Sequence, residues 1–380
     1  MKHTLTFYTN IPSPYNLDLF EALANDFDLT VVYYSKLENG RQWKIDTEHP
    51  NYCSKVLENN WIGRFIQKFK SEFHFSSGIL RLAISDDSTF VILGGNYFSP
   101  NTYIVLLLSK VKRKKIFWFG EKLLPKSSFI KTKIKRLLLL PLFNSCYGIL
   151  CVGQAAIKSY QDFGYKGNCY NIPYSIKSSN FDVKALDKTK LEDIKQALNP
   201  ENKLVILTSG SLIHRKGIDI AIQSYLNLPS AIKSKTMLWI AGDGPLRAEL
   251  EVMDDKSGDI RFLGFLDSKD LPYYFNLSSV FLFCSRYDGW AVVINEALSA
   301  QLPVVVSDQV TAAELITDNI NGFVCESDNV AAFTQSLEKI LMGSDLRLEM
   351  SNNNYQLSQQ WNSEAIASKV SKILTQIQIV

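Results

Sequence analysis

Short, nearly continuous apolar runs alternate along the chain with longer segments in which apolar residues recur every three or four positions. Continuous runs rich in Val, Ile, Leu and Phe are typical of strands buried on both faces of a parallel sheet, and the periodic segments are typical of covering helices. The runs predict strands at Leu5–Thr9, Leu29–Tyr34, Phe90–Leu93, Lys115–Phe119, Gly148–Val152, Leu204–Ser209, Met237–Ala241, Val280–Cys284, Val304–Ser307 and Gly322–Cys325. This alternation predicts an α/β chain with doubly wound parallel sheets.

The predicted strands fall into two sets, separated by the polar and irregular stretch Ile172–Lys203. A length of 380 residues fits two or three domains, so we place the domain junction in this stretch. A last helix near Trp361–Ile377 follows the polar run Ser351–Gln360 and is expected to return to the first domain. The predicted organisation is an N-terminal domain at 1–175, a second domain at 176–358 and a returning terminal helix at 359–380.

Composition excludes several protein classes. A chain with 46% hydrophobic and 12% aromatic residues is not intrinsically disordered, and 12 Pro and 19 Gly in 380 residues exclude a collagen. No apolar run approaches the roughly 18 residues needed to span a bilayer, and the N-terminus lacks a secretory apolar region. The six cysteines show no metal-ligand spacing, so we expect buried free thiols in a reducing cytoplasm.

The net charge of +3 conceals an asymmetry. Residues 1–170 contain 22 basic and 13 acidic residues, whereas the remainder contains 19 basic and 25 acidic residues. Most of the basic excess lies in Val56–Leu140, in blocks around Trp61–Lys70, Lys110–Lys115 and Lys122–Arg136, where it is interleaved with Trp, Phe and Leu. This combination suits an anionic membrane surface, with an ordinary solvated helix face as the alternative and nucleic acid as an unlikely partner.

Three loops at predicted strand ends carry candidate chemistry. In the first, Gly210 allows a sharp exit from a strand, and Arg215 and Lys216 lie directly before a helix that begins near Gly217. Cations beside free helix N–H groups form a natural diphosphate site, and an unliganded basic loop is the alternative.

The second loop, Gly242–Pro245, is a glycine turn before a helix and is a weak signal alone. In the third, Asp288 lies in a loop and Glu296 inside the helix that follows, with Gly289 allowing close approach of a ligand. A carboxylate placed like that of Glu296 suits a ribose diol, although isolated surface acids are the default interpretation. All three loops follow strands of one sheet, at the edge where open α/β sheets bind ligands.

Together the three loops resemble the donor-binding half of retaining GT-B glycosyltransferases, specifically glycosyltransferase family 4. The motifs that match are Gly210-Ser211-Leu212, Lys216-Gly217, Gly242-Asp243-Gly244-Pro245, Phe262-Leu263-Gly264-Phe265, the acids Asp288 and Glu296, and Pro303-Val304-Val305. The resemblance is strong over Val205–Phe323, and Ile11–Asn16 and Asn171–Pro173 match more loosely. Two positions depart from the family pattern: Ser211 replaces its usual arginine, for which we expect Arg215 to substitute, and Asp288 replaces its usual glutamate.

The resemblance implies a GT-B fold of two facing Rossmann-like domains with a deep interdomain cleft. It also implies transfer of a sugar from a nucleotide-diphosphate sugar to a glycan or lipid-linked acceptor, with retention and without a metal or other cofactor, in cell-surface polysaccharide or glycolipid assembly. Arg215, Lys216, Asp288 and Glu296 are the expected catalytic residues. The expected donor-binding residues are Gly210, Ser211, Leu212, Gly242, Gly244, Phe262, Leu263, Gly264, Arg286, Gly289, Trp290, Ala291 and Val292.

The acceptor is expected to bind the first domain near Pro12, Ser13, Tyr15, Asn16 and Glu121. A lipid-anchored acceptor requires docking on a membrane, which gives the basic first domain a use. We therefore expect a cytoplasmic protein, peripheral at the inner face of the cell membrane.

Three alternatives differ in class. A nucleotide-sugar epimerase or a phosphorylase of the same fold needs acid–base groups or a pyridoxal lysine, for which the sequence offers no clear candidate. A non-catalytic nucleotide-sugar-binding relic is favoured by Ser211 and Asp288. The single Asp-x-Asp pair, Asp26 and Asp28, lies at the wrong end of a strand for a metal-dependent transferase, and the four histidines show no metal spacing.

Overall fold

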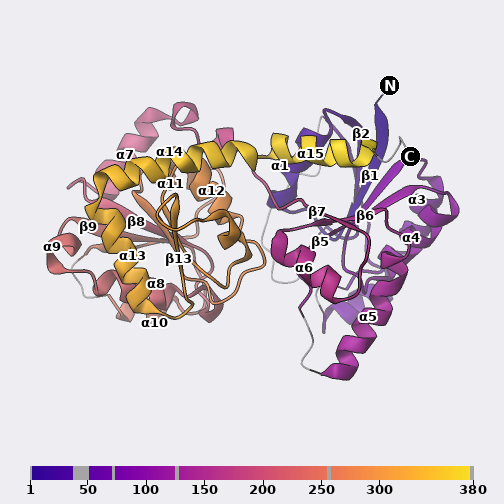
Figure 1. Cartoon of the computed structure of the whole chain (residues 1–380), viewed down its shortest axis with the longest axis horizontal. Coiled ribbons are helices and arrows are strands. Elements are labelled where there is room, and N and C mark those ends of the chain that lie inside the picture. The colour runs from indigo at the N-terminus through magenta and orange to yellow at the C-terminus, as the bar shows by residue number, and fades with distance from the viewer. Residues whose placement is uncertain (1, 37–50, 71–72, 125–127, 255–257, 377–380) are drawn as a thin grey trace. The chain divides into compact units, whose positions relative to one another are not determined.

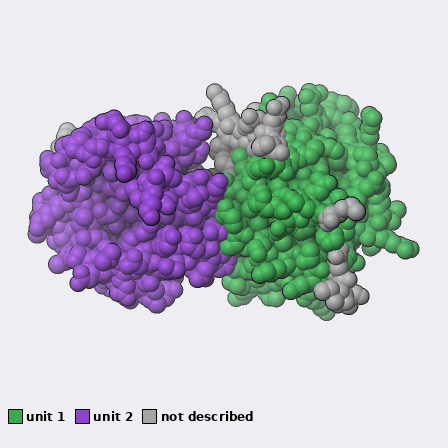
Figure 2. All heavy atoms as spheres, turned by 90° about the horizontal axis from the view of Figure 1, so that it is seen from above, with its two compact units in different colours: residues 1–175, 363–380 green, residues 176–362 purple. Residues whose placement is uncertain are grey.

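The computed structural model describes residues 2–36, 51–70, 73–124, 128–254 and 258–376, except for the side chains of Pro14 and Tyr15. Its contacts divide the chain into two compact units, shown in Figure 2. Unit 1 consists of Met1–Ser175 with Ser363–Val380, and unit 2 of Ile176–Asn362. The chain thus re-enters unit 1 at Ser363, whereas the sequence analysis placed this return at residue 359.

Unit 1 is built on a parallel sheet of seven strands in the order β3-β2-β1-β4-β5-β6-β7. The strands are β1 (His3–Thr9), β2 (Phe27–Tyr33), β3 (Cys53–Val56), β4 (Phe90–Gly94), β5 (Lys115–Gly120), β6 (Gly148–Cys151) and β7 (Asn168–Asn171). The order reverses between β1 and β4, which pair directly with each other, so this pair marks the switch point of a doubly wound sheet.

Helices cover both faces of this sheet because its strands are apolar on both sides. One face packs Tyr8, Leu93 and Trp118 against a layer made of α3 (Gly78–Ser85), α4 (Pro100–Val111), α5 (Phe129–Phe143) and α6 (Gln154–Asp162). On the other face Phe7 meets Phe20 of α1 (Pro14–Leu23). The terminal helix α15 (Ser363–Gln376), yellow in Figure 1, lies beside α1. The short helix α2 (Trp61–Gln67) follows β3.

Unit 2 repeats the architecture with six parallel strands in the order β10-β9-β8-β11-β12-β13. They are β8 (Leu204–Ser209), β9 (Thr236–Ala241), β10 (Ile260–Gly264), β11 (Val280–Phe283), β12 (Val304–Ser307) and β13 (Gly322–Cys325). Its switch point is the pair β8 and β11.

The core of unit 2 lies on both sides of this sheet. Leu238 and Leu282 pack toward α8 (Ile218–Leu226), α10 (Arg247–Val252) and α13 (Val330–Met342). Phe281 stacks on Phe275 of α11 (Leu271–Asn276) on the other face, where α12 (Val293–Ser299) packs on α14 (Ser344–Gln360). The remaining helices are α7 (Lys188–Leu198), α9 (Ser230–Lys233) and the 3₁₀ turns Ser178–Phe181, Val183–Ala185, His214–Lys216 and Thr311–Leu315.

All ten predicted strands are present, and no end differs from its prediction by more than two residues. The stretch Ile172–Lys203, which we predicted as irregular, contains the helix α7. The polar run Ser351–Gln360 forms the second half of α14. The expectation of buried thiols holds only in part, because Cys151, Cys284 and Cys325 are buried, whereas Cys146 and Cys169 are half-buried and Cys53 is exposed. All six thiols are free.

Candidate active site

The candidate site of unit 2 lies at the carboxyl ends of β8 and β11. These strands are neighbours at the switch point, so the loop after β8, which carries Arg215 and Lys216, meets the loop after β11, which carries Asp288. Open α/β sheets bind ligands at such a position because the two connecting helices diverge there and leave the strand ends accessible.

Two glycines allow the strand-end loops to approach each other. A Cβ atom on Gly217 would lie 2.1 Å from the carbonyl oxygen of Cys284, and one on Gly242 would lie 1.9 Å from that of Gly210. Both glycines also have positive φ angles, 64° and 145°. The ends of β8, β9 and β11 are therefore brought together by positions that only glycine fits.

Two cations converge on one carboxylate in the site. Oδ2 of Asp288 lies 2.5 Å from Nζ of Lys216 and 3.2 Å from Nη1 of Arg215, which also donates to the carbonyl of Tyr287 at 2.7 Å. The side chains of Lys216 and Asp288 are only 16% and 14% exposed, whereas that of Arg215 is 45% exposed. In the free protein Asp288 thus occupies the position of an anion between both cations.

Arg286 joins three segments of the site. Its guanidinium bonds both carboxylate oxygens of Asp219 at 2.9 and 2.7 Å, the carboxylate of Asp328 at 2.6 Å and the carbonyl of His214 at 2.6 Å. Partial burial alone would raise the pKa of Asp219, but the hydrogen bonds and charge of Arg286 hold it below its usual value. The hydrogen bonds that Arg286 donates to Asp219 in turn raise the pKa of Arg286. Sequence reasoning missed Asp219 and Asp328; the carboxylate in the first turn of α8 was the available signal.

The segment after Asp288 enters α12 through a strained turn. Ala291 has a φ of 64°, in the left-handed region, and Trp290 is buried with its Nε1 donating to Oδ1 of Asn295 at 2.9 Å. Glu296 is half-buried on α12. The side chains of Trp290 and Val292 therefore hold the turn in the core, while Gly289, Ala291 and Glu296 stay partly accessible.

The other donor-binding candidates divide between core and surface. Leu212 is fully buried, and its backbone bonds Asp243 and Leu246, which ties the β8 loop to the β9 turn. The N–H of Gly242 donates to the carbonyl of Gly264 at 2.7 Å, so the end of β10 joins the same edge. The candidates Gly210, Gly244, Phe262 and Leu263 are half-buried along this edge, and Ser211 is exposed.

The acceptor-binding candidates lie at the equivalent edge of unit 1. Pro12, Ser13 and Asn16 follow β1 at its carboxyl end, with Pro12 and Asn16 buried, and Oδ1 of Asn16 is buried without a hydrogen-bond partner among the described residues. Tyr15 belongs to α1, but its side chain lies outside the described part. Glu121 follows β5 and accepts a hydrogen bond from the hydroxyl of Tyr174 at 2.7 Å.

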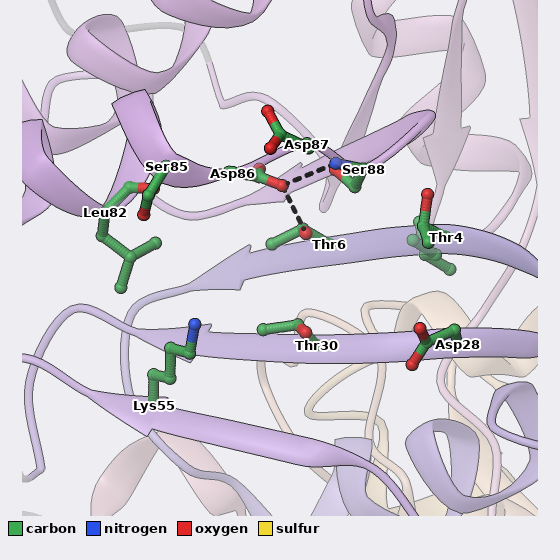
Figure 3. Close-up of a pocket in the computed structure, with 11 residues that line it drawn as sticks. Thr4, Thr6, Asp28, Thr30, Lys55, Leu82, Ser85, Asp86, Asp87 and Ser88 are labelled. Atoms are coloured by element: carbon green, nitrogen blue, oxygen red, sulfur yellow. Dashed lines mark hydrogen bonds between the residues drawn. The ribbon is translucent and has the colours of Figure 1, made fainter.

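A different cavity of unit 1, of about 240 Å³, lies at the opposite, amino-terminal edge of the sheet. Figure 3 shows Thr6 and Ser88 directed at Asp86, the centre of its polar cluster. Asp86 also accepts from Tyr8 at 2.8 Å and pairs with the buried Lys114 at 2.9 Å. Because its buried groups satisfy one another, we assign this cluster a structural role.

The two acids of the Asp-x-Asp pair lie at the edge of unit 1 opposite the strand ends that carry the acceptor-binding candidates. Asp26 accepts a hydrogen bond from Ser371, and Asp28 is exposed at the start of β2, again at the amino-terminal edge. Across the described ranges, no group of three or more His, Cys, Asp or Glu side chains is placed to hold a metal ion.

Comparison with known proteins agrees with this geometry. Residues 189–357 match the family model described as glycosyl transferases group 1, and the matched segment contains all three strand-end loops. The match lies within unit 2 and covers less than half of the chain.

Two curated relatives show how far the likeness extends. The chain is 23% identical over 373 residues to the GalNAc-alpha-(1->4)-GalNAc-alpha-(1->3)-diNAcBac-PP-undecaprenol alpha-1,4-N-acetyl-D-galactosaminyltransferase of Campylobacter jejuni, covering 94% of this chain and 93% of that protein. It is 24% identical over 164 residues to the alpha-D-kanosaminyltransferase of Streptomyces kanamyceticus, covering 42% of each. The chain spans about half the length, or less, of several curated relatives that it matches.

The solved structure of the Anabaena protein HepE in complex with UDP shares the fold, with a TM-score of 0.78 and 16% identity over 98% of this chain and 100% of that chain. The predicted fold class, two doubly wound units of the GT-B type, is confirmed.

Proposed function

We propose that the chain is a retaining, metal-independent glycosyltransferase that moves a sugar from a nucleotide-diphosphate sugar to a glycan or lipid-linked acceptor in cell-surface polysaccharide or glycolipid assembly. The convergence of Arg215 and Lys216 on Asp288 carries this proposal, because it places two cations at the switch point of a glycosyl transferases group 1 domain. Of the relatives, the Campylobacter protein is named for a lipid-linked glycan acceptor. The structure of HepE was solved with UDP, so a uridine nucleotide is the first donor type to test.

Departure of the nucleoside diphosphate is the step that the cations serve. As the glycosidic bond breaks, negative charge develops on the leaving diphosphate, and a fixed lysine and arginine stabilise it without solvent reorganisation. Lys216 is largely shielded from water, which strengthens its interaction with that charge. We propose that these cations replace the divalent metal that many sugar transferases use.

The carboxylates have separate roles in this proposal. Glu296, on α12 and half-buried, holds the ribose diol. Asp288 orients the donor sugar once the diphosphate has taken its place between the cations, and backbone at Phe262–Gly264 flanks the base. The acceptor binds unit 1 near Pro12–Asn16 and Glu121.

Replacing Glu296 tests whether this carboxylate holds the ribose of the donor. Glu296→Ala should abolish transfer from a radiolabelled nucleotide sugar, while the exposed control Glu249→Ala keeps wild-type turnover. Transfer should persist in EDTA, and NMR of the product should show the anomeric configuration of the donor. Unchanged turnover in Glu296→Ala would remove the site assignment, and nucleotide binding without any transfer would favour the non-catalytic relic.

We further propose that the chain is a cytoplasmic protein that docks on the anionic inner face of the membrane through Val56–Leu140, of which residues 71–72 and 125–127, including Lys126, lie outside the described part. The charge of this region supports the proposal. Within it, Ser88–Leu140 contains eleven Lys and Arg residues and a single acid, Glu121. No helix in the described ranges is both long and apolar enough to cross a membrane.

Helix α5, magenta in Figure 1, is the best docking element in this region. One side packs Leu139 and Leu142 into unit 1, but Ile130, Ile134 and Leu137, which share another face, are 68%, 51% and 64% exposed. Lys131 and Lys133 flank this apolar stripe and are exposed as well. An apolar stripe between cations fits a layer of anionic lipid, whereas a second copy of the same basic surface would be repelled.

Vesicle sedimentation tests the docking. The full chain should bind phosphatidylglycerol vesicles at low salt, and Ile130→Ser/Ile134→Ser/Leu137→Ser should bind at least tenfold more weakly. The matched control Val252→Ser/Met342→Ser removes two exposed apolar side chains of unit 2 and should bind like the wild type. Equal sedimentation of the α5 variant and the wild type would refute docking through α5.

A further inference from the structure

We infer that Arg286 is a positioning residue that holds the Arg215–Lys216 loop in its binding geometry, and that it acts through Asp219 rather than by contacting the donor. The inference deepens the proposed function, on which it rests, and it revises the expectation that Arg286 binds the donor directly.

All three nitrogens of the Arg286 guanidinium are engaged within the protein. Nη1 and Nη2 form a paired contact with the two oxygens of Asp219, and Nε bonds Asp328. Planar paired contacts of this kind are the strongest geometry that a guanidinium makes with a carboxylate. The Arg286 side chain is 18% exposed. Counting the bond to His214, the Arg286 side chain uses four N–H groups within the protein. A guanidinium has about five such donors, so a paired contact with a diphosphate would require it to leave Asp219 or Asp328.

Arg286 also bonds the loop that carries Arg215 and Lys216, at the start of that loop. Nη1 donates to the carbonyl of His214, the residue before Arg215, at 2.6 Å. The backbone N–H of Arg286 donates to the carbonyl of Arg215 at 2.8 Å, and the hydroxyl of the preceding Ser285 donates to the same oxygen at 3.0 Å. The carbonyls of the turn are thus bonded to the end of β11, so the Arg215 and Lys216 side chains start from a fixed backbone.

Arg286 is also paired with the helix that follows the loop. Asp219 lies in the first turn of α8, directly after the left-handed Gly217, so the Arg286–Asp219 pair joins α8 to β11 across the turn. Asp328 adds a third support from the segment after β13. The bonds that Arg286 makes to the loop, Asp219 and Asp328 thus restrict the loop before an anion binds. Because the loop then loses little conformational entropy on binding, its affinity for the anion is higher.

Neutralising Asp219 distinguishes positioning from direct contact, because the two roles predict opposite effects. If Arg286 bound the donor directly, Asp219→Asn would free its guanidinium and leave affinity unchanged or higher. If Arg286 positions the loop, Asp219→Asn and Arg286→Lys should each weaken nucleoside diphosphate binding about tenfold, and the double variant should weaken it little further.

The experiment is calorimetric titration of the full chain with UDP and GDP, together with hydrogen exchange of the amides of residues 213–217. The matched control is Lys203→Met, which breaks the similarly shielded Lys203–Asp259 pair of unit 2 at the amino-terminal side of β8 and should lower stability without changing affinity. Faster exchange of the loop in both site variants, with weaker binding, is the expected result.

Affinity that is unchanged or higher in Asp219→Asn, or loop exchange equal to wild type, would overturn the inference while leaving the proposed function intact. A wild-type chain that binds no nucleoside diphosphate would instead refute the proposed function, and loop exchange would then still decide whether Arg286 orders the turn.

Discussion

Asp288 pairs with both Lys216 and Arg215 and offsets one of their two positive charges, so a diphosphate bound by these cations would compete with an internal carboxylate. Asp288→Asn should therefore raise affinity for a nucleoside diphosphate roughly threefold to tenfold, because the cations lose their counter-ion. Sugar transfer should fall by about 100-fold because the oriented carboxylate is gone. Titration calorimetry and turnover measure the two effects, with Asp288→Glu as the charge-preserving control. Unchanged affinity in Asp288→Asn would show that the pairing does not compete with the ligand.

The stability of unit 1 should depend on pH through the carboxyl group of Asp86. Burial alone would raise its pKa, but hydrogen bonds from Lys114, Ser88 and Tyr8 lower it below the value in the unfolded chain. Its ionised form therefore stabilises the fold above the unfolded pKa of about 4, and this contribution is lost as the pH falls toward the folded pKa.

Asp86→Asn should cost about 3 kcal/mol at pH 7 because it leaves Lys114 charged and buried without its partner. Between pH 5 and pH 3 the variant should lose less stability than the wild type. Urea unfolding at several pH values measures both, and parallel pH profiles of the two proteins would contradict the role of this pair.

At the scale of elements, the carboxyl edge of unit 2 depends on close contact between β8 and β9. Gly242→Ala would place a Cβ against the carbonyl of Gly210, so we expect a loss of about 2–4 kcal/mol and of nucleotide binding. Gly258→Ala is the control, since Gly258 also has a positive φ but no neighbour within 4 Å, and it should cost only about 1 kcal/mol. Chemical denaturation compares the two, and equal losses would show that backbone strain rather than the contact matters.

The elements that sequence patterns predicted are those buried on both faces. The continuous apolar run of β8 predicted both ends of that strand correctly. The edge strands β3 (Cys53–Val56) and β7 (Asn168–Asn171) were not predicted, because they are short and polar. Helix α7 was missed because it buries no residue, so its sequence reads as a polar linker. Its capping Asp187 was the available signal.

Sequence patterns also predicted only some of the site residues. The motifs located Arg215, Lys216 and Asp288, because each follows an apolar strand, and the parallel topology brings those strand ends to one edge. The partners of Arg286 lie 67 and 42 residues away along the chain, on two other elements. Side-chain pairing over such separations depends on tertiary structure, which a single sequence does not reveal.

At the scale of the whole molecule, the terminal helix completes unit 1 rather than the unit that precedes it. Its residues Ile366, Val370 and Leu374 are buried, and Lys369 donates to the carbonyl of Asn171 in unit 1 at 2.8 Å. Removing residues 363–380 should expose the apolar surface of α1 and destabilise unit 1, while β8 and β9 keep their protection. Hydrogen exchange by mass spectrometry resolves the units separately, and an equal loss of protection in both would contradict this division.

We expect unit 2 to bind a nucleoside diphosphate through Arg215 and Lys216 without a metal. Calorimetric titration of the full chain with UDP and GDP in the presence of EDTA measures this binding. At least one of the two nucleotides should bind saturably, and Lys216→Met should weaken its binding at least tenfold. Binding that appears only after a divalent metal is added, or that is unchanged in Lys216→Met, would contradict this expectation.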